Sequence, residues 1–141
     1  MTESLTTLKA IANHLTAKGG EVMIGMGRAA MRARIVDFPA HVNIQFRSSG
    51  VVRVSLALPV PVTDANREVL ALALAQLNRQ QLGGGFVIPR TTVVFLTQIP
   101  IEATGGIERH QLDRTLELAI DSCRSALPGL EKIGKTGLAA V

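Results

Sequence analysis

Alternation of apolar and polar residues in two adjacent segments constrains the fold of this chain more than any other feature of its sequence. In His41–Arg47 and in Val51–Leu58 every second residue is apolar, and a Ser-Ser-Gly turn separates the two segments. Within Ala29–Phe38, Met31, Ala33 and Ile35 alternate with Arg32 and Arg34. Because a period of two gives each strand one apolar face, the three segments predict an antiparallel meander buried on one side.

Apolar residues at helical spacing predict one helix before this meander and one after it. Residues 5–15 carry apolar side chains at steps of three and four, which is the period of an amphipathic helix. Pro59 and Pro61 are expected to end the last strand of the meander. Residues 69–77 then return to helical spacing, with apolar positions over a wide arc. Glu21–Met26, ahead of the meander, is either a further strand or only the lead-in to one.

A hairpin and a last helix complete the predicted elements. Phe86–Ile88 and Thr92–Ile99 read as two strands, and residues 112–127 as a helix that ends at Pro128. Because the strands are grouped between helices, the sequence predicts an α+β fold. We expect an antiparallel sheet of about five strands, in the order α-β-β-β-α-β-β-α, with the helices packed mainly on one face.

Length and composition fit a single domain. The chain has 141 residues, of which 47% are hydrophobic and 18% charged, so it can bury a sizeable core. We expect residues 1–128 to form the domain and residues 129–141 a flexible basic tail. Its longest apolar run is far shorter than a membrane span, and its first residues do not resemble a secretion signal. A cytoplasmic protein without membrane contact is therefore expected.

The reactive residue types give no complete catalytic or metal site. Cys123 is the single cysteine and falls on the apolar stripe of the last predicted helix, where a thiol belongs to the core. The histidines at 14, 41 and 110 are scattered, without the spacing of metal ligands. We therefore predict no catalytic residue, no cofactor and no metal.

Two nucleotide-binding motifs are matched in letters but lack the required context. Gly129–Thr136 fits the P-loop pattern, yet a helix precedes it and only five residues follow, so no later helix can point its amino end at a phosphate. Gly25–Ala30 echoes a dinucleotide fingerprint, but the next segment is predicted as a strand rather than a helix. Neither match predicts a nucleotide site.

Arginines on the polar side of the meander form the one candidate binding surface. Residues 28–90 carry eight Arg against three acids, whereas residues 102–131 carry six acids against three Arg. Alternation places four of these arginines on one sheet face, with two more beside it. The candidate nucleic-acid-binding residues are Arg28, Arg32, Arg34, Arg47, Arg53 and Arg90. An ordinary solvated face explains the same pattern, and without Trp or Tyr any DNA contact would be mainly electrostatic.

Three carboxylates repeat along the last predicted helix. Asp113, Glu117 and Asp121 stand four residues apart and so lie on one helix face, with arginines within reach. A solvated, partly paired face is the first interpretation. A docking surface for a basic partner is the second.

The order of elements resembles the YbjN family, whose fold is shared with the class I type III secretion chaperones. The resemblance covers about residues 3–128. It is carried by Leu77-Asn78-Arg79 late in the second helix, Phe86 opening the next strand, Val93-Val94-Phe95-Leu96 in the last strand, and a helix ending near Pro128. It implies a small, usually dimeric, non-enzymatic protein that binds a segment of another protein.

Two functions from different classes are expected from these observations. The first is a non-catalytic adaptor or chaperone-like module, a homodimer with a protein partner. The second is direct, weakly sequence-specific binding of single-stranded or duplex DNA through the arginine face. A protein partner that itself handles DNA would reconcile the two.

Overall fold

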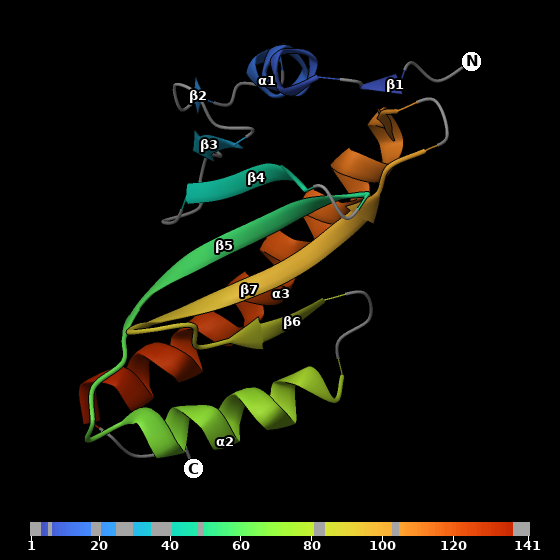
Figure 1. Cartoon of the computed structure of the whole chain (residues 1–141). Coiled ribbons are helices and arrows are strands. Elements are labelled where there is room, and N and C mark those ends of the chain that lie inside the picture. The colour runs from blue at the N-terminus through green and yellow to red at the C-terminus, as the bar shows by residue number, and fades with distance from the viewer. Residues whose placement is uncertain are drawn as a thin grey trace.

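A six-stranded antiparallel sheet in the order β2-β3-β4-β5-β7-β6 forms the centre of the fold, and a two-stranded sheet pairs β1 with β8 (Figure 1). The computed structural model describes residues 4–5, 7–17, 21–24, 30–34, 41–47, 50–80, 84–102 and 105–136. The strands are β1 (Ser4–Leu5), β2 (Glu21–Ile24), β3 (Ala30–Arg34), β4 (His41–Arg47), β5 (Val51–Pro61), β6 (Gly84–Val87), β7 (Thr92–Pro100) and β8 (Ile107–Glu108). The helices are α1 (Leu8–Ala17), α2 (Arg67–Asn78) and α3 (Arg109–Thr136).

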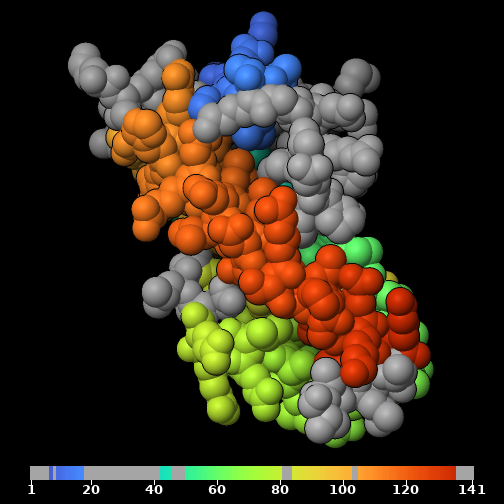
Figure 2. Space-filling model, turned by 180° about the vertical axis from the view of Figure 1, so that it is seen from behind, coloured from blue at the N-terminus to red at the C-terminus, as the bar shows by residue number. Residues whose placement is uncertain are grey.

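The three helices cover one face of the large sheet. Figure 2 shows α3 running across that face, with α1 near one end of α3 and α2 beside the other. The sheet meets α3 through β5 and β7, with fully buried side chains at alternate positions, namely Val52, Val54 and Leu56 of β5 and Val93 and Ile99 of β7. The opposite face of β5, β7 and β6 lies toward the viewer in Figure 1. The predicted α+β class, antiparallel sheet and one-sided helices are therefore confirmed.

β5 is longer than its prolines predicted. The strand continues through Pro59 to Pro61, and its pairing with β7 shifts register between Ala57 and Pro61. A bulge tolerates proline because the residues in it do not need to donate an N–H to the next strand. The expectation that these prolines end the meander is therefore wrong for Pro59 and right for Pro61, where β5 ends, and Leu58 and Val60 add to the core.

Three further strands lie outside the five that were expected. Glu21–Ile24 pairs with β3 as β2, which settles the open alternative in favour of a strand. Ser4–Leu5 and Ile107–Glu108 pair with each other as β1 and β8. These two strands have only two residues each, too few for an alternating pattern to be visible in the sequence.

α3 extends well past the end that the sequence predicted. The helix runs through Pro128 and Gly129 to Thr136, and Leu130 and Ile133 are buried at 2% and 4% exposure. Both keep the three- and four-residue spacing that begins at Leu112, so the gain from burying them outweighs the hydrogen bond that the proline removes. The expectation that the helix ends at Pro128, with a separate tail from residue 129, is thus wrong for residues 129–136. Residues 137–141 lie outside the described residues.

No helix in the described part of the chain combines the length and apolar character that a membrane span requires.

Candidate functional site

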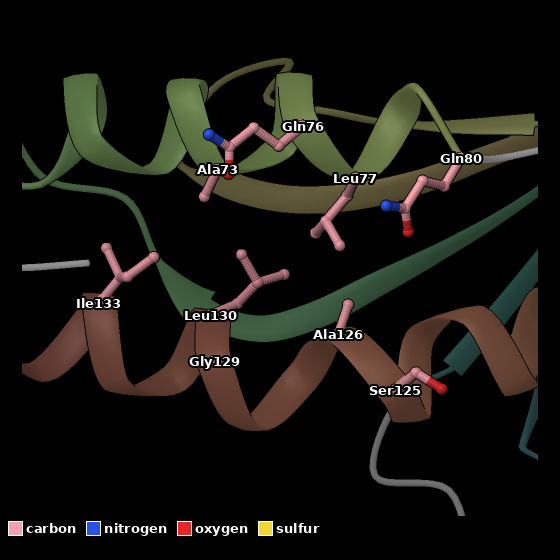
Figure 3. Close-up of a pocket in the computed structure, with 9 residues that line it drawn as sticks. All are labelled: Ala73, Gln76, Leu77, Gln80, Ser125, Ala126, Gly129, Leu130 and Ile133. Carbon is pink, nitrogen blue, oxygen red and sulfur yellow. The ribbon is translucent and has the colours of Figure 1, made fainter. Parts of the chain in front are cut away.

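A groove of about 350 Å³ separates α2 from the C-terminal half of α3 (Figure 3). Both helices pack on the same side of the sheet, and their facing side chains leave this space between them. The lining residues are Ala73, Gln76, Leu77 and Gln80 from α2 and its C-terminal turn, and Ser125, Ala126, Gly129, Leu130 and Ile133 from α3.

The groove has an apolar floor and a neutral polar rim. Ala126, Leu130 and Ile133 are buried, whereas Ala73 and Leu77 are half-buried and present apolar surface to the space. Gln76, Gln80 and Ser125 are exposed along its edges. None of the lining residues is charged, so the groove is suited to an apolar side chain flanked by neutral hydrogen-bonding groups.

Small residues create this space. Gly129 is helical, and a Cβ added there would meet no atom within 4 Å. Ala73 and Ala126 contribute only methyl groups on the two helices. Sequence reasoning missed the groove because it ended the last helix at Pro128. The signal that could have revealed it is the continued spacing of Leu130 and Ile133 beyond the proline.

The open face of the sheet is the second candidate surface. Arg32 pairs with Asn43 and Gln45 pairs with Arg53, so these positions share one face, opposite the buried Val42 and Ile44. Because residues two apart on a strand share a face, Arg34 and Arg47 belong to it as well. The register thus places four of the six predicted arginines on one face.

Of the other two predicted arginines, the structure describes Arg90 alone, and it does not lie on this face. Arg90 is exposed in the turn between β6 and β7, and its carbonyl oxygen accepts a hydrogen bond of 2.9 Å from the guanidinium of Arg67. Arg28 lies outside the described residues.

Apolar residues occupy the other half of the open face. Ala57, Val94 and Val87 pair in one row across β5, β7 and β6, and Leu96 stands in the next row between Ser55 and Gly85. Val87 is 41% exposed. Since Gly84 and Gly85 have no side chains, a shallow hollow of about 380 Å³ opens beside Leu96 and Gln98. The open face is therefore basic toward β3 and β4 and apolar toward β6.

The described parts of the remaining sequence motifs do not have the conformation or grouping of a nucleotide or metal site. The Gly129–Thr136 match to a P-loop is helical throughout, which is not the loop conformation that cradles a phosphate. Of Gly25–Ala30 only the last residue is described, and it opens β3. Cys123 is fully buried in the core, as predicted, and burial raises the pKa of its thiol from 9.0 to about 12. Within the described residues no three His, Cys, Asp or Glu side chains gather as metal ligands do.

The acidic stripe of α3 has a partner that sequence spacing could not indicate. His14 Nε2 of α1 lies 2.7 Å from Asp113 Oδ1, across 99 residues of chain. Glu117 and Asp121 are exposed. Asp113 therefore holds α1 against α3. The prediction of a solvated face fits the other two carboxylates, Glu117 and Asp121.

Comparison with known proteins agrees with this fold. The family model of YbjN, described as "Putative bacterial sensory transduction regulator", matches residues 7–132. The crystal structure of YbjN from E. coli, described there as "a putative transcription regulator", superimposes with a TM-score of 0.67 at 12% sequence identity, and all of both chains is covered. A search of the curated proteins found no match. The predicted resemblance is confirmed, and the matched region includes four residues beyond Pro128, where α3 continues. The chain belongs to the YbjN family.

Proposed function

We propose that this protein is a non-catalytic adaptor that binds an apolar segment of another protein in the groove between α2 and α3. The observation that carries the proposal is the groove itself, with an apolar floor of Ala126, Leu130 and Ile133 under a neutral rim. A partner helix laid between two helices is a recurring mode of peptide recognition.

The chemistry of the groove favours such a segment over a charged ligand. Burying one large apolar side chain of the partner contributes about 1.5–3 kcal/mol. The carboxamides of Gln76 and Gln80 can bond polar groups at the edge of a docked segment without requiring a charge on it. Two or three such anchors suffice for a regulated, reversible complex.

The family and the related structure support a regulatory role. The family is described as "Putative bacterial sensory transduction regulator", and the E. coli protein as "a putative transcription regulator". Binding to a partner is a way to regulate without catalysis. Saturable hydrolysis of a nucleotide that disappears in Lys135→Ala would overturn the non-catalytic part of the proposal.

We also propose that the protein is a homodimer. Leu72 on α2 is 64% exposed and faces away from the core, so a second copy could cover it. Light scattering at micromolar concentration should give twice the 15.0 kDa mass of one chain, and Leu72→Glu should halve it. A mass of one chain for the unaltered protein would contradict the dimer.

The adaptor function is tested by capture experiments with a variant that fills the groove. Gly129→Leu adds a side chain where a Cβ meets nothing, so it should block the groove without disturbing the core. Gln111→Leu adds the same side chain to an exposed position near the start of α3 and serves as the control. A partner protein that the unaltered chain and Gln111→Leu both capture should not be captured by Gly129→Leu. Equal capture by all three would contradict the groove as the binding site.

Direct DNA binding is the second candidate function, and the register of the arginines favours it. Arg32, Arg34, Arg47 and Arg53 hold four positions of one face. If each contacts a phosphate, replacing all four by Ala should weaken binding at every sequence and flatten the salt dependence by roughly 0.7–0.9 per contact. A mobility shift on single-stranded and duplex DNA measures this, and no shift even at low salt would remove the candidate.

A further inference from the structure

Arg53 carries a polar atom that the fold buries and leaves unpaired. Its side chain is half-buried on the open face. Its Nε is inaccessible to solvent and has no hydrogen-bond partner among the described residues. A buried donor without an acceptor is costly, and for a charged group more so. A ligand oxygen that accepts a hydrogen bond from the guanidinium would offset part of this cost.

The neighbours of Arg53 in the sheet are suited to holding an anion. Gln45 on β4 and Gln98 on β7 pair with Arg53 from either side, so two carboxamides flank the guanidinium in one row. Among the described strand positions of this face, Glu21 is the one acid. It lies in β2, beyond β3, and pairs there with Arg34. From β2 to β5 is three strand spacings, or about 14 Å. No acid among the described strand positions of this face therefore lies close enough to neutralise the positive charge of Arg53.

An apolar contact lies one row away on the same face. Leu96 of β7 pairs with Ser55, two residues beyond Arg53 along β5, which places the two rows about 7 Å apart. Val94 and Val87 extend the apolar surface one row further. An acidic residue and an apolar residue have this separation when they are two apart in an extended segment, or four apart on a helix.

We propose that the open face binds a second stretch of the protein partner, one that carries an acidic residue and an apolar residue on the same side, two apart in an extended segment or four apart on a helix. The carboxylate pairs with the guanidinium of Arg53 between Gln45 and Gln98, and the apolar side chain packs on Leu96. This inference rests on the proposed adaptor function but uses a surface separate from the α2–α3 groove.

The apolar row favours a protein segment over DNA at this surface. A phosphate backbone gains nothing from Leu96, Val94 and Val87, and the described positions of this face offer no Trp or Tyr on which a base could stack. An acidic and apolar peptide matches both halves of the face.

Fluorescence anisotropy with designed peptides tests this inference. The probe is a labelled nine-residue peptide in which Glu and Leu alternate at every second position, with Ser between them, so that Glu and Leu lie two apart on one face of an extended segment. It is compared with peptides in which Gln or Lys replaces Glu. The Glu peptide should bind more tightly than the other two and lose affinity as salt rises. Arg53→Gln should weaken its binding about 10-fold, as expected for a hydrogen bond to a charged group, and Arg53→Lys should weaken it less. Leu96→Ser should weaken all three peptides.

Matched controls separate this inference from the adaptor proposal. Arg90→Gln removes an exposed arginine outside the face and should bind as the unaltered protein does. Binding of the Glu peptide that is absent, or unchanged in Arg53→Gln, would overturn the inference. The inference would also be overturned if duplex DNA displaced the Glu peptide and bound the protein more tightly than the peptide does in the same assay. If the captured partner is lost from Gly129→Leu but kept by Arg53→Gln, the groove stands and the open face fails.

Discussion

The side-chain amide of Asn78 hydrogen-bonds both backbone groups of Phe86. Asn78 Nδ2 donates to the Phe86 carbonyl at 2.9 Å, and Asn78 Oδ1 accepts from the Phe86 N–H at 2.6 Å. Phe86 stands in β6, the last strand of the large sheet, so its outward groups have no neighbouring strand in the described residues. The amide at the end of α2 thus takes the place that one peptide group of a further strand would occupy, and protects the edge from pairing with other chains.

Asn78→Ala should destabilise the protein by about 1–3 kcal/mol, because it leaves two backbone groups of Phe86 without partners. Asn78→Asp keeps an acceptor for the N–H but loses the donor, so its free energy of unfolding should lie between that of the unaltered protein and that of Asn78→Ala. Urea unfolding measures both variants. Arg79→Ala, at the next and exposed residue, is the control and should stay within about 0.5 kcal/mol of the unaltered protein. If Asn78→Ala lowered the free energy of unfolding no more than Arg79→Ala does, the amide would not stabilise the edge strand.

His14 and Asp113 should behave as a coupled pair in a double-mutant cycle. Their side chains are only 9% and 24% exposed, and the contact holds α1 on α3. Replacing each by Ala, and then both, should give a coupling of about 1 kcal/mol in the free energy of unfolding. His14→Ala with Asp121→Ala should be additive within about 0.5 kcal/mol, since Asp121 is exposed two turns further along α3. Additivity in the first cycle would contradict the pairing.

Two glycines should respond to alanine in opposite directions. At Gly84 an added Cβ would lie 2.8 Å from Cζ of Phe95 and 3.0 Å from the Leu96 carbonyl oxygen, so Gly84→Ala should cost about 1–3 kcal/mol. At Gly129 it meets nothing within 4 Å, and Gly129→Ala should stabilise α3 by about 0.5–1 kcal/mol. Thermal unfolding of both variants checks the pair. A destabilised Gly129→Ala would contradict the open space at this position.

Alkaline pH should destabilise the protein through Cys123. Burial raises the pKa of the thiol to about 12 from 9.0, so the folded state keeps a proton that the unfolded state loses. This contribution is fully present below pH 9 and is lost as the pH rises toward 12. Between about pH 8 and pH 10 the free energy of unfolding should fall by about 1.4 kcal/mol more in the unaltered protein than in Cys123→Ala. Equal slopes would show that the thiol titrates normally in the folded protein.

Alternation and helical spacing predicted the sheet and the three helices, because each pattern is local. Val42 and Val54 were placed correctly in the core for this reason. Local rules failed at Pro59 and Pro128, where a bulge in β5 and the burial of Leu130 outweigh the preference of proline. Both errors came from reading proline as a stop signal.

The candidate sites were predictable only where register follows from alternation. Arg32 and Arg53 share a face because both belong to the alternating segments. The groove depends on how far α2 lies from α3, and the contact of His14 with Asp113 joins distant parts of the chain. No local pattern contains either distance.

Binding of a captured partner segment to the groove variants tests the proposed function most directly. Titration calorimetry of that segment should give a dissociation constant at least about 10-fold weaker for Gly129→Leu than for the unaltered protein, because the added side chain fills the space that an apolar anchor needs. Gln111→Leu should bind as the unaltered protein does. Equal dissociation constants for all three proteins would contradict binding in the groove between α2 and α3.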